Sequence, residues 1–137
     1  MSTILCIDEE EQVRNIIVDE LGELGHEVLS TNDGLNGLKL IHQNKPDLVI
    51  CEISMPGMGG FQLMDEIRKK YTLLAMMPFI FLSAFSDEKH ILAGLKMGAD
   101  HYLTKPVDNE LLKATVEASL RQMARIKYNE SVSVLDV

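Results

Sequence analysis

The sequence predicts an α/β fold in which a parallel β-sheet is covered by helices on both faces. Short apolar runs alternate five times with segments whose apolar residues recur at every third or fourth position. The loops between these segments are short. Uninterrupted apolar runs are typical of strands that are buried on both faces, and their alternation with amphipathic helices is typical of a parallel sheet.

The first half of the chain predicts three strand-helix units. The expected strands are residues 3–7, residues 27–30, and an apolar run that begins at Asp47 and ends at Glu52. Helical spacing of apolar residues follows each strand, over residues 13–24, 35–41 and 61–71. Gly25 ends the first helical pattern, and the turn at residues 55–57 ends the third strand abruptly.

The second half predicts two further units. Residues 78–85 form a fourth buried strand, and the helical stripe that follows it ends at Gly98. A brief fifth strand over residues 101–104 precedes Asp108, which can cap a final helix. The helical pattern fades from about Tyr128. We therefore expect one domain over residues 1–127, with residues 128–137 as a C-terminal tail or linker.

The composition narrows the class of function. The chain has 137 residues with a formal net charge of -8, and 13 basic residues against 21 acidic ones argue against a nucleic-acid surface. Neither a leader sequence nor an apolar stretch of about 18 residues is present, so we expect a cytoplasmic domain without a membrane span. Cys6 and Cys51 fall inside apolar runs and are expected to be buried thiols. The methionines fall mostly on apolar stripes or turns, which favours core filling.

Polar residues follow four of the expected strands, at the point where each strand ends. They are Asp8, Glu9, Glu52, Ser83 and Lys105. In a doubly wound sheet with the order 2-1-3-4-5, these side chains converge on one crevice. Crowded carboxylates favour a bound cation, and carboxylate oxygens suit magnesium. A lysine and a hydroxyl opposite it suit a phosphoryl group.

Each of these signals has an ordinary explanation when it is taken alone. Acidic residues after a strand, such as Asp8 and Glu9, commonly interact with the dipole of the helix that follows. A lone serine or lysine at a strand end is usually solvated. Their joint placement at four strand ends is what favours a magnesium-dependent phosphoryl site.

Four sequence motifs together resemble the receiver domain of two-component response regulators. They are IDEEEQVR, Glu52 followed by ISMPGMGG, FLSAF and YLTKP, and the resemblance extends over about residues 3–125. It implies a flavodoxin-like fold, a doubly wound five-stranded parallel sheet with the order 2-1-3-4-5.

The resemblance also assigns a role to each matching position. Asp8 and Glu9 match the acidic pair that holds Mg2+, to which the Glu52 position and the backbone carbonyl of Ser54 would add ligands. Asp is the commoner residue at the position of Glu9.

Further matches concern the phosphoryl group and the switch. Ser83 matches the hydroxyl that engages the phosphoryl group, and Lys105 matches the lysine that pairs with its oxygens. Pro106 matches a proline that often follows a cis bond in this family. Tyr102 matches an aromatic switch that swings inward when the hydroxyl moves, although an ordinary half-buried strand tyrosine would look the same.

The departure from the family lies at the phosphoacceptor. A receiver uses Asp as its nucleophile, whereas this chain has Glu52. One extra methylene moves the carboxylate by about 1.5 Å, and displacements near 1 Å can cost about a hundredfold in rate. We therefore expect Glu52 to accept phosphate poorly or not at all. Alternatively, its carboxylate reaches Lys105 or Ser83 directly and partly mimics a phosphoryl group.

The family resemblance implies a signalling switch, not an enzyme. Its partners would be a sensor histidine kinase or phosphotransfer protein, and an output domain or effector protein. A homodimer could form through the face of the fourth helix, fifth strand and fifth helix. One alternative is a small magnesium-dependent phosphatase or phosphotransferase, against which the short loops and the missing Asp nucleophile argue. A flavin carrier is disfavoured by the acids that follow the first strand.

Overall fold

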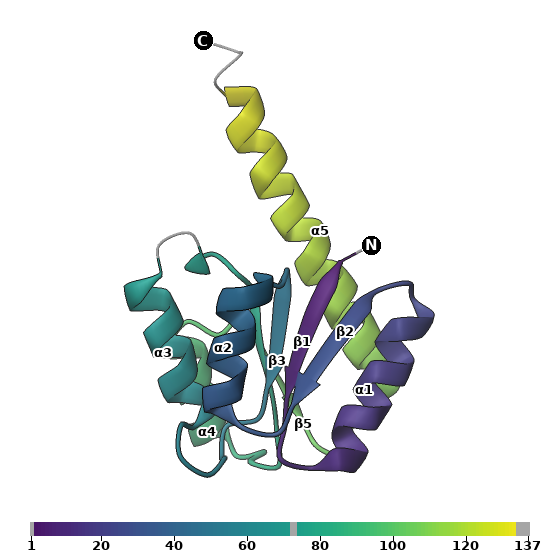
Figure 1. The fold of residues 1–137 in the computed structure, drawn as a ribbon, viewed down its shortest axis with the longest axis vertical. Coiled ribbons are helices and arrows are strands. Elements are labelled where there is room, and N and C mark those ends of the chain that lie inside the picture. The colour runs from purple at the N-terminus through teal and green to yellow at the C-terminus, as the bar shows by residue number, and fades with distance from the viewer. Residues whose placement is uncertain (1, 72–73, 134–137) are drawn as a thin grey trace.

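The five strands form one parallel sheet. The computed structural model describes residues 2–71 and 74–133, with side chains up to residue 129. The strands are β1 (Thr3–Ile7), β2 (Glu27–Thr31), β3 (Leu48–Cys51), β4 (Phe79–Ser83) and β5 (His101–Thr104). They pair in the order β2-β1-β3-β4-β5 (Figure 1), which confirms the predicted order.

Five helices cover both faces of the sheet. They are α1 (Glu11–Glu23), α2 (Gly34–Asn44), α3 (Gly60–Lys70), α4 (Glu88–Lys96) and α5 (Asn109–Ser133). One core lies between the sheet and α1 and α5, and the other lies under α2, α3 and α4 (Figure 1). Within the described ranges, no helix is long and apolar enough to cross a membrane.

Alternating side chains of the central strands supply the two cores. In β1, Ile4 and Cys6 belong to the core under α1 and α5, while Leu5 and Ile7 belong to the opposite core. Cys51 lies in the second core, so the two cysteines face opposite sides of the sheet. Both are buried and free, as expected, and burial raises the pKa of the Cys6 thiol to about 12.

Helix α4 is less buried than its apolar residues predict. Leu92 and Leu95 lie on the expected apolar stripe, but they are 44% and 43% exposed. The buried residue of this helix is Gly94, which packs against the rings of Phe61, Phe81 and Tyr102. Because a glycine forms the contact, α4 lies close to the sheet and its leucines remain at the surface.

Helix α5 is longer than the sequence predicts. Asp108 caps it by accepting a hydrogen bond of 3.0 Å from the N–H of Leu111, as expected. The helix continues to Ser133, although the apolar pattern fades from about Tyr128. Its last turns project beyond the sheet (Figure 1). Residues 134–137 of the predicted tail lie outside the described residues, and the role of residues 128–137 stays a prediction.

Gly60 places the start of α3 against the strand end that carries Glu52. A Cβ atom at residue 60 would collide with the backbone carbonyl oxygen of Glu52. The N–H of Gly60 also donates to the Ile53 carbonyl, at 2.8 Å. Only a residue without a side chain allows this approach of α3 to the strand end.

We predict that Gly60→Ala lowers the free energy of unfolding by about 1–3 kcal/mol, because the Glu52 backbone must move. Gly22→Ala is the matched control, since a Cβ atom there meets nothing within 4 Å. The control should stabilise α1 by about 0.5–1 kcal/mol. Urea denaturation measures both, and equal effects of the two substitutions would contradict the close contact at residue 60.

Candidate functional site

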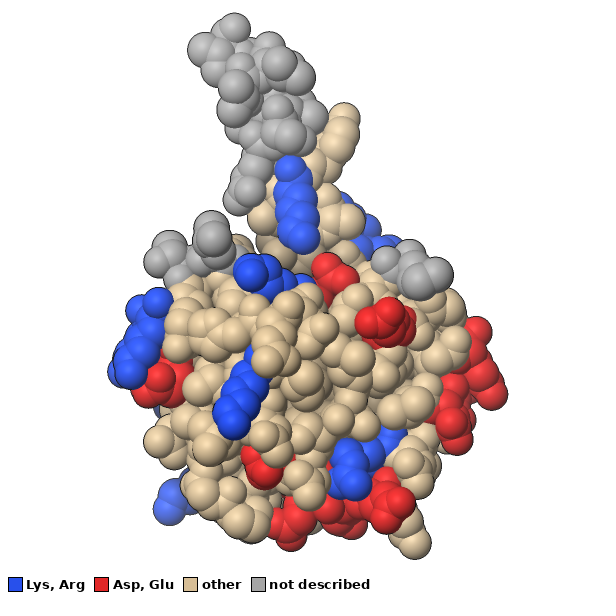
Figure 2. Space-filling model, in the orientation of Figure 1, with Lys and Arg blue, Asp and Glu red and all other residues tan. Residues whose placement is uncertain are grey.

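The carboxyl ends of four strands bring polar side chains to one edge of the sheet. Asp8 follows β1, Glu52 follows β3, Ser83 ends β4 and Lys105 follows β5. Acidic and basic side chains gather at this edge, at the bottom of the view in Figure 2. Asp8, Glu52 and Ser83 are buried there.

The ammonium group of Lys105 is the centre of the site. Its Nζ lies 3.0 Å from Oδ2 of Asp8 and 3.0 Å from Oε1 of Glu52. It also lies 2.6 Å from Oε1 of Glu10. The three donors of an ammonium group match three carboxylate partners. The Lys105 side chain is only 10% exposed, so its ion pairs with Asp8 and Glu52 are largely shielded from water, whereas Glu10 is exposed.

Both carboxylate oxygens of Glu52 have hydrogen-bond donors. Oε1 accepts from Lys105, and Oε2 accepts from the backbone N–H of Ile53 at 2.6 Å. The carboxylate therefore folds back toward its own strand end while it reaches across to Lys105. Direct contact with Lys105 was one of the two arrangements that the sequence suggested for the Glu52 carboxylate.

The site has more negative than positive charge. Burial raises the pKa of the Asp8 carboxyl, even though the N–H of Glu10 and the Lys105 ammonium favour its charged form. Burial alone would lower the pKa of Lys105, but its hydrogen bonds to Glu10, Glu52 and Asp8 raise it above the ordinary value. One ammonium group thus forms ion pairs with three carboxylates. A further cation would relieve the remaining repulsion.

Glu10 is a member of the site that sequence reasoning missed. It stands in a run of four acidic residues, and the pattern does not show which of them points at Lys105. Glu9, which the family pattern favours, is exposed, and it makes no ion pair with Lys105 among the described side chains. Its backbone carbonyl and that of Asp8 accept from Nη1 of Arg14, at 3.2 and 2.6 Å.

Two of the predicted metal ligands share one partner. Asp8 and Glu52 both contact Lys105, and the metal-binding role of these residues, Glu9 and the Ser54 carbonyl stays a prediction. In the part of the chain that the structure describes, no group of three or more Asp, Glu, His or Cys side chains has the arrangement of a metal site. The donors that do converge are hard carboxylate oxygens, the kind that magnesium prefers.

A chain of hydrogen bonds links Ser83 to Tyr102. The N–H of Phe85 donates to Oγ of Ser83 at 3.2 Å, and the hydroxyl of Tyr102 donates to the Phe85 carbonyl at 2.6 Å. The Tyr102 ring also packs against Gly94 of α4. The loop after β4 therefore connects the buried serine to the tyrosine and to α4.

The turn after β5 holds Lys105 in place. The Lys105-Pro106 peptide bond is cis, as the family resemblance implied. The N–H of Lys105 donates to the carbonyl of Ser83 at 2.8 Å, which ties the lysine to the end of β4.

Comparison with known proteins identifies the family. The family model of the response regulator receiver domain matches residues 4–117. This chain belongs to the response regulator receiver family. The predicted family and the predicted flavodoxin-like fold are therefore both confirmed.

Curated relatives extend beyond this receiver. The transcriptional regulatory protein AfsQ1 of Streptomyces coelicolor is 34% identical over 125 residues, which are 91% of this chain and 54% of the relative. The probable transcriptional regulator ycf27 of Guillardia theta is 34% identical over 130 residues, which are 95% of this chain and 50% of the relative. The chain thus spans about half the length of these relatives.

Solved receiver structures have the same fold. The receiver domain of Francisella response regulator 1452 superposes with a TM-score of 0.82 at 28% identity, covering 90% of this chain and 99% of the other. The chemotaxis protein CheY4 of Vibrio cholerae gives a TM-score of 0.80 at 25% identity, with 87% and 98% covered. The acidic site thus lies on a receiver scaffold.

We predict that Lys105→Met lowers the free energy of unfolding at pH 7 by about 2–4 kcal/mol, because Asp8 and Glu52 are left buried without a counter-charge. The control is Lys69→Met, which removes an exposed ion pair with Asp65 and should change stability little. Chemical denaturation compares the two variants. Equal effects would show that the Lys105 ion pairs contribute no more than a surface pair.

We predict that Asp8→Asn raises the free energy of unfolding at pH 7, since burial in the folded receiver raises the Asp8 pKa. A raised pKa means that Asp8 favours the folded state below its unfolded pKa and loses this contribution as pH rises through the folded value. The advantage of Asn should therefore vanish as the pH falls toward 4.

Thermal denaturation between pH 4 and 7 measures this trend. Glu9→Gln is the control at an exposed neighbouring acid and should show a much smaller dependence. An Asp8→Asn variant that is less stable at pH 7, or whose advantage does not depend on pH, would contradict the assignment.

Proposed function

We propose that this chain is the signal switch of a two-component phosphorelay and that Glu52 prevents its normal phosphorylation. The observation that carries the proposal is the 3.0 Å ion pair between Oε1 of Glu52 and Nζ of Lys105. The other oxygen accepts from the N–H of Ile53, so both oxygens are held by hydrogen bonds in the place that the longer side chain gives them. A carboxylate nucleophile must point at the phosphorus atom. The chain acts as a binding switch and not as an enzyme.

The same ion pair supports partial mimicry of the phosphorylated state. Glu52 brings one negative charge and two oxygens to Lys105, whereas a phosphoryl group would bring about -1.5 to -2 charges and three oxygens. The hydroxyl of Ser83 accepts from the N–H of Phe85 and makes no hydrogen bond to Glu52 in the described structure. Glu52 thus reproduces the contact of a phosphoryl group with Lys105 but not the contact with Ser83.

Tyr102 is the element through which the site would act on the surface. Its hydroxyl donates a hydrogen bond to the carbonyl of Phe85, whose N–H donates to Ser83. Its ring packs against Gly94 of α4. A shift of Ser83 toward a phosphoryl group would move Phe85 and the partner of the Tyr102 hydroxyl. A two-state loop of this kind needs only a small difference in free energy to change its populations.

Magnesium is the cofactor that suits the site. Asp8, Glu9, Glu52 and the backbone carbonyl of Ser54 are the residues that would hold it. The fit rests on Asp8, a buried carboxylate with a raised pKa in a cluster where three carboxylates share one lysine. Magnesium takes one or two carboxylates and keeps several waters. When bound, it would neutralise carboxylates and phosphoryl oxygens.

The partner surface is the face of α4, β5 and α5. Leu92 and Leu95 of α4 and Leu111 of α5 are between 43% and 52% exposed. Exposed apolar side chains of this size suit contact with a protein partner. We propose that this face contacts an output domain, an effector protein or a second copy of the chain. A sensor histidine kinase or phosphotransfer protein in the cytoplasm would be the upstream partner, and the names of the curated relatives favour transcriptional output.

We predict that acetyl phosphate with magnesium produces no slower band on a phosphate-affinity gel for the chain with Glu52. Glu52→Asp should produce one, because it shortens the side chain to the length that receivers use. Glu52→Gln is the control for a side chain that cannot be phosphorylated. A shifted band for the unchanged chain would overturn the proposed block.

Size-exclusion chromatography of the same samples distinguishes two effects of Glu52: it only prevents phosphorylation, or it also imitates the phosphorylated state. If Glu52 is a mimic, the unchanged chain should elute like the phosphorylated Glu52→Asp variant. If Glu52 is only a block, it should elute like the unphosphorylated variant.

A further inference from the structure

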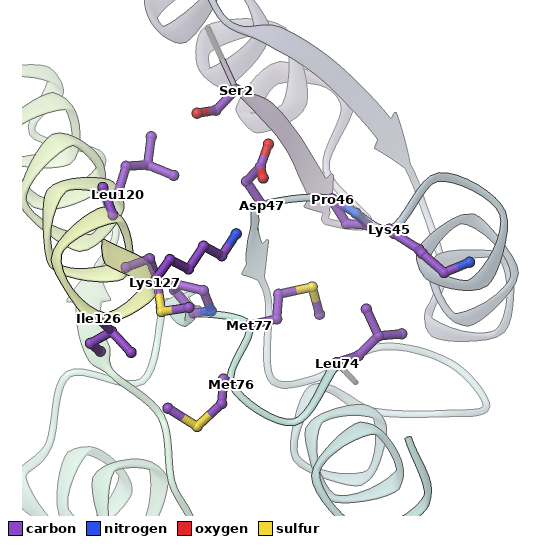
Figure 3. A pocket seen from close by; sticks show the side chains of 13 residues that line it. Ser2, Lys45, Pro46, Asp47, Leu74, Met76, Met77, Leu120, Ile126 and Lys127 are labelled. Atoms are coloured by element: carbon purple, nitrogen blue, oxygen red, sulfur yellow. The ribbon is translucent and has the colours of Figure 1, made fainter. Parts of the chain in front are cut away.

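A cavity of about 500 Å3 lies at the edge of the sheet opposite the acidic site. It opens between α5 and the segments that lead into β3 and β4 (Figure 3). Leu120, Met123 and Ile126 of α5 form one side, and Met76 and Met77 lie across from them. Cavities of roughly 300–1000 Å3 with mainly apolar walls are typical of sites for small molecules.

The sequence suggested that the methionines fill the core, but not all of those that line this cavity are buried in it. Met77 is buried, but Met76 is 60% exposed, and both line the cavity together with Met123. Methionine side chains are flexible and polarizable, so they adapt to apolar ligands of different shapes. This wall is therefore suited to an apolar body without a fixed outline.

The polar residues of the cavity favour an anion. Lys45 and Lys127 line it, and neither pairs with a carboxylate among the side chains that the structure describes. Asp47 also lines it, but its Oδ2 already accepts from the N–H of Thr3 at 2.8 Å. Figure 3 shows the ammonium group of Lys127 directed into the cavity and that of Lys45 directed away from it. The Lys127 ammonium is therefore the cation that a single anionic group of a ligand would contact.

A buried hydroxyl beside the cavity lacks a partner. Ser119 is 3% exposed, and its Oγ has no hydrogen bond within the described part of the chain. It lines a second cavity of about 140 Å3, which shares Met76, Pro78, Met123 and Ile126 with the first. A buried hydroxyl without a partner is costly, so rotation of the Ser119 side chain toward a polar ligand atom in this space would be favourable.

We propose that the cavity binds a small amphipathic monoanion, with an apolar body between Met76 and Met123 and a carboxylate-like or sulfonate-like group at Lys127. Such a ligand would contact α5 and the loop before β4 at the same time, and would hold the projecting helix in one orientation to the sheet. The site is separate from the acidic site, so the proposal does not depend on the phosphorylation chemistry.

Fluorescence titration of the whole chain with 8-anilinonaphthalene-1-sulfonate tests the proposal, because this probe has an apolar body and one sulfonate. Ala124→Phe fills the cavity from an exposed position on α5 and should weaken binding at least about tenfold. Lys127→Gln removes the proposed cationic partner and should weaken it about fivefold.

Two controls separate this site from general apolar adsorption. Leu35→Ser removes an exposed leucine of α2 and should leave the affinity unchanged within about twofold. N-phenyl-1-naphthylamine lacks the sulfonate, so it should bind more weakly and be insensitive to Lys127→Gln. Thermal denaturation checks that each variant remains folded.

Probe affinity that survives Ala124→Phe, or that falls in Leu35→Ser alone, would overturn the cavity as the site. Equal affinity for the neutral and anionic probes would overturn the proposed anion.

Discussion

The ammonium group of Lys105 contacts three carboxylates, which come from two segments of the chain that lie far apart in the sequence from each other and from Lys105. Asp8 follows β1, Glu10 precedes α1, and Glu52 follows β3. They meet because parallel strands end at one edge of the sheet, and the order β2-β1-β3 makes the ends of β1 and β3 neighbours. The site therefore depends on one buried cation that holds more negative charge than it neutralises.

The length of Glu52 decides how this cluster is arranged. Its carboxylate bonds Lys105 and the N–H of Ile53 at once, so the acceptor position is satisfied from within the chain. The serine side of the site is not engaged, because Ser83 is bonded to the loop after β4. That loop also accepts the hydroxyl of Tyr102. A charge at the Glu52 position thus contacts Lys105 directly, and Ser83 with its loop forms a hydrogen-bonded connection to Tyr102 and α4.

The sequence was sufficient for the strands, their order and the strand-end positions of Asp8, Glu52, Ser83 and Lys105. Buried parallel strands have an uninterrupted apolar pattern, and the topology then fixes which ends are neighbours. Glu10 could not be chosen from a run of four acids, because side-chain direction at the start of a helix leaves no pattern. The exposed leucines of α4 were missed because the contact of Gly94 with three aromatic rings is tertiary. The cavity beside α5 could not be predicted for the same reason, since residues from segments distant in the sequence line it.

A double-mutant cycle between Glu52 and Lys105 tests most directly whether their ion pair organises the site. Glu52→Gln, Lys105→Met and the double variant are compared with the unchanged chain by chemical denaturation at pH 7. A buried, hydrogen-bonded pair predicts a coupling free energy of at least about 1 kcal/mol, with the double variant less destabilised than the sum of the single ones. Additive effects would mean that Glu52 does not hold Lys105 and that the acceptor position is open.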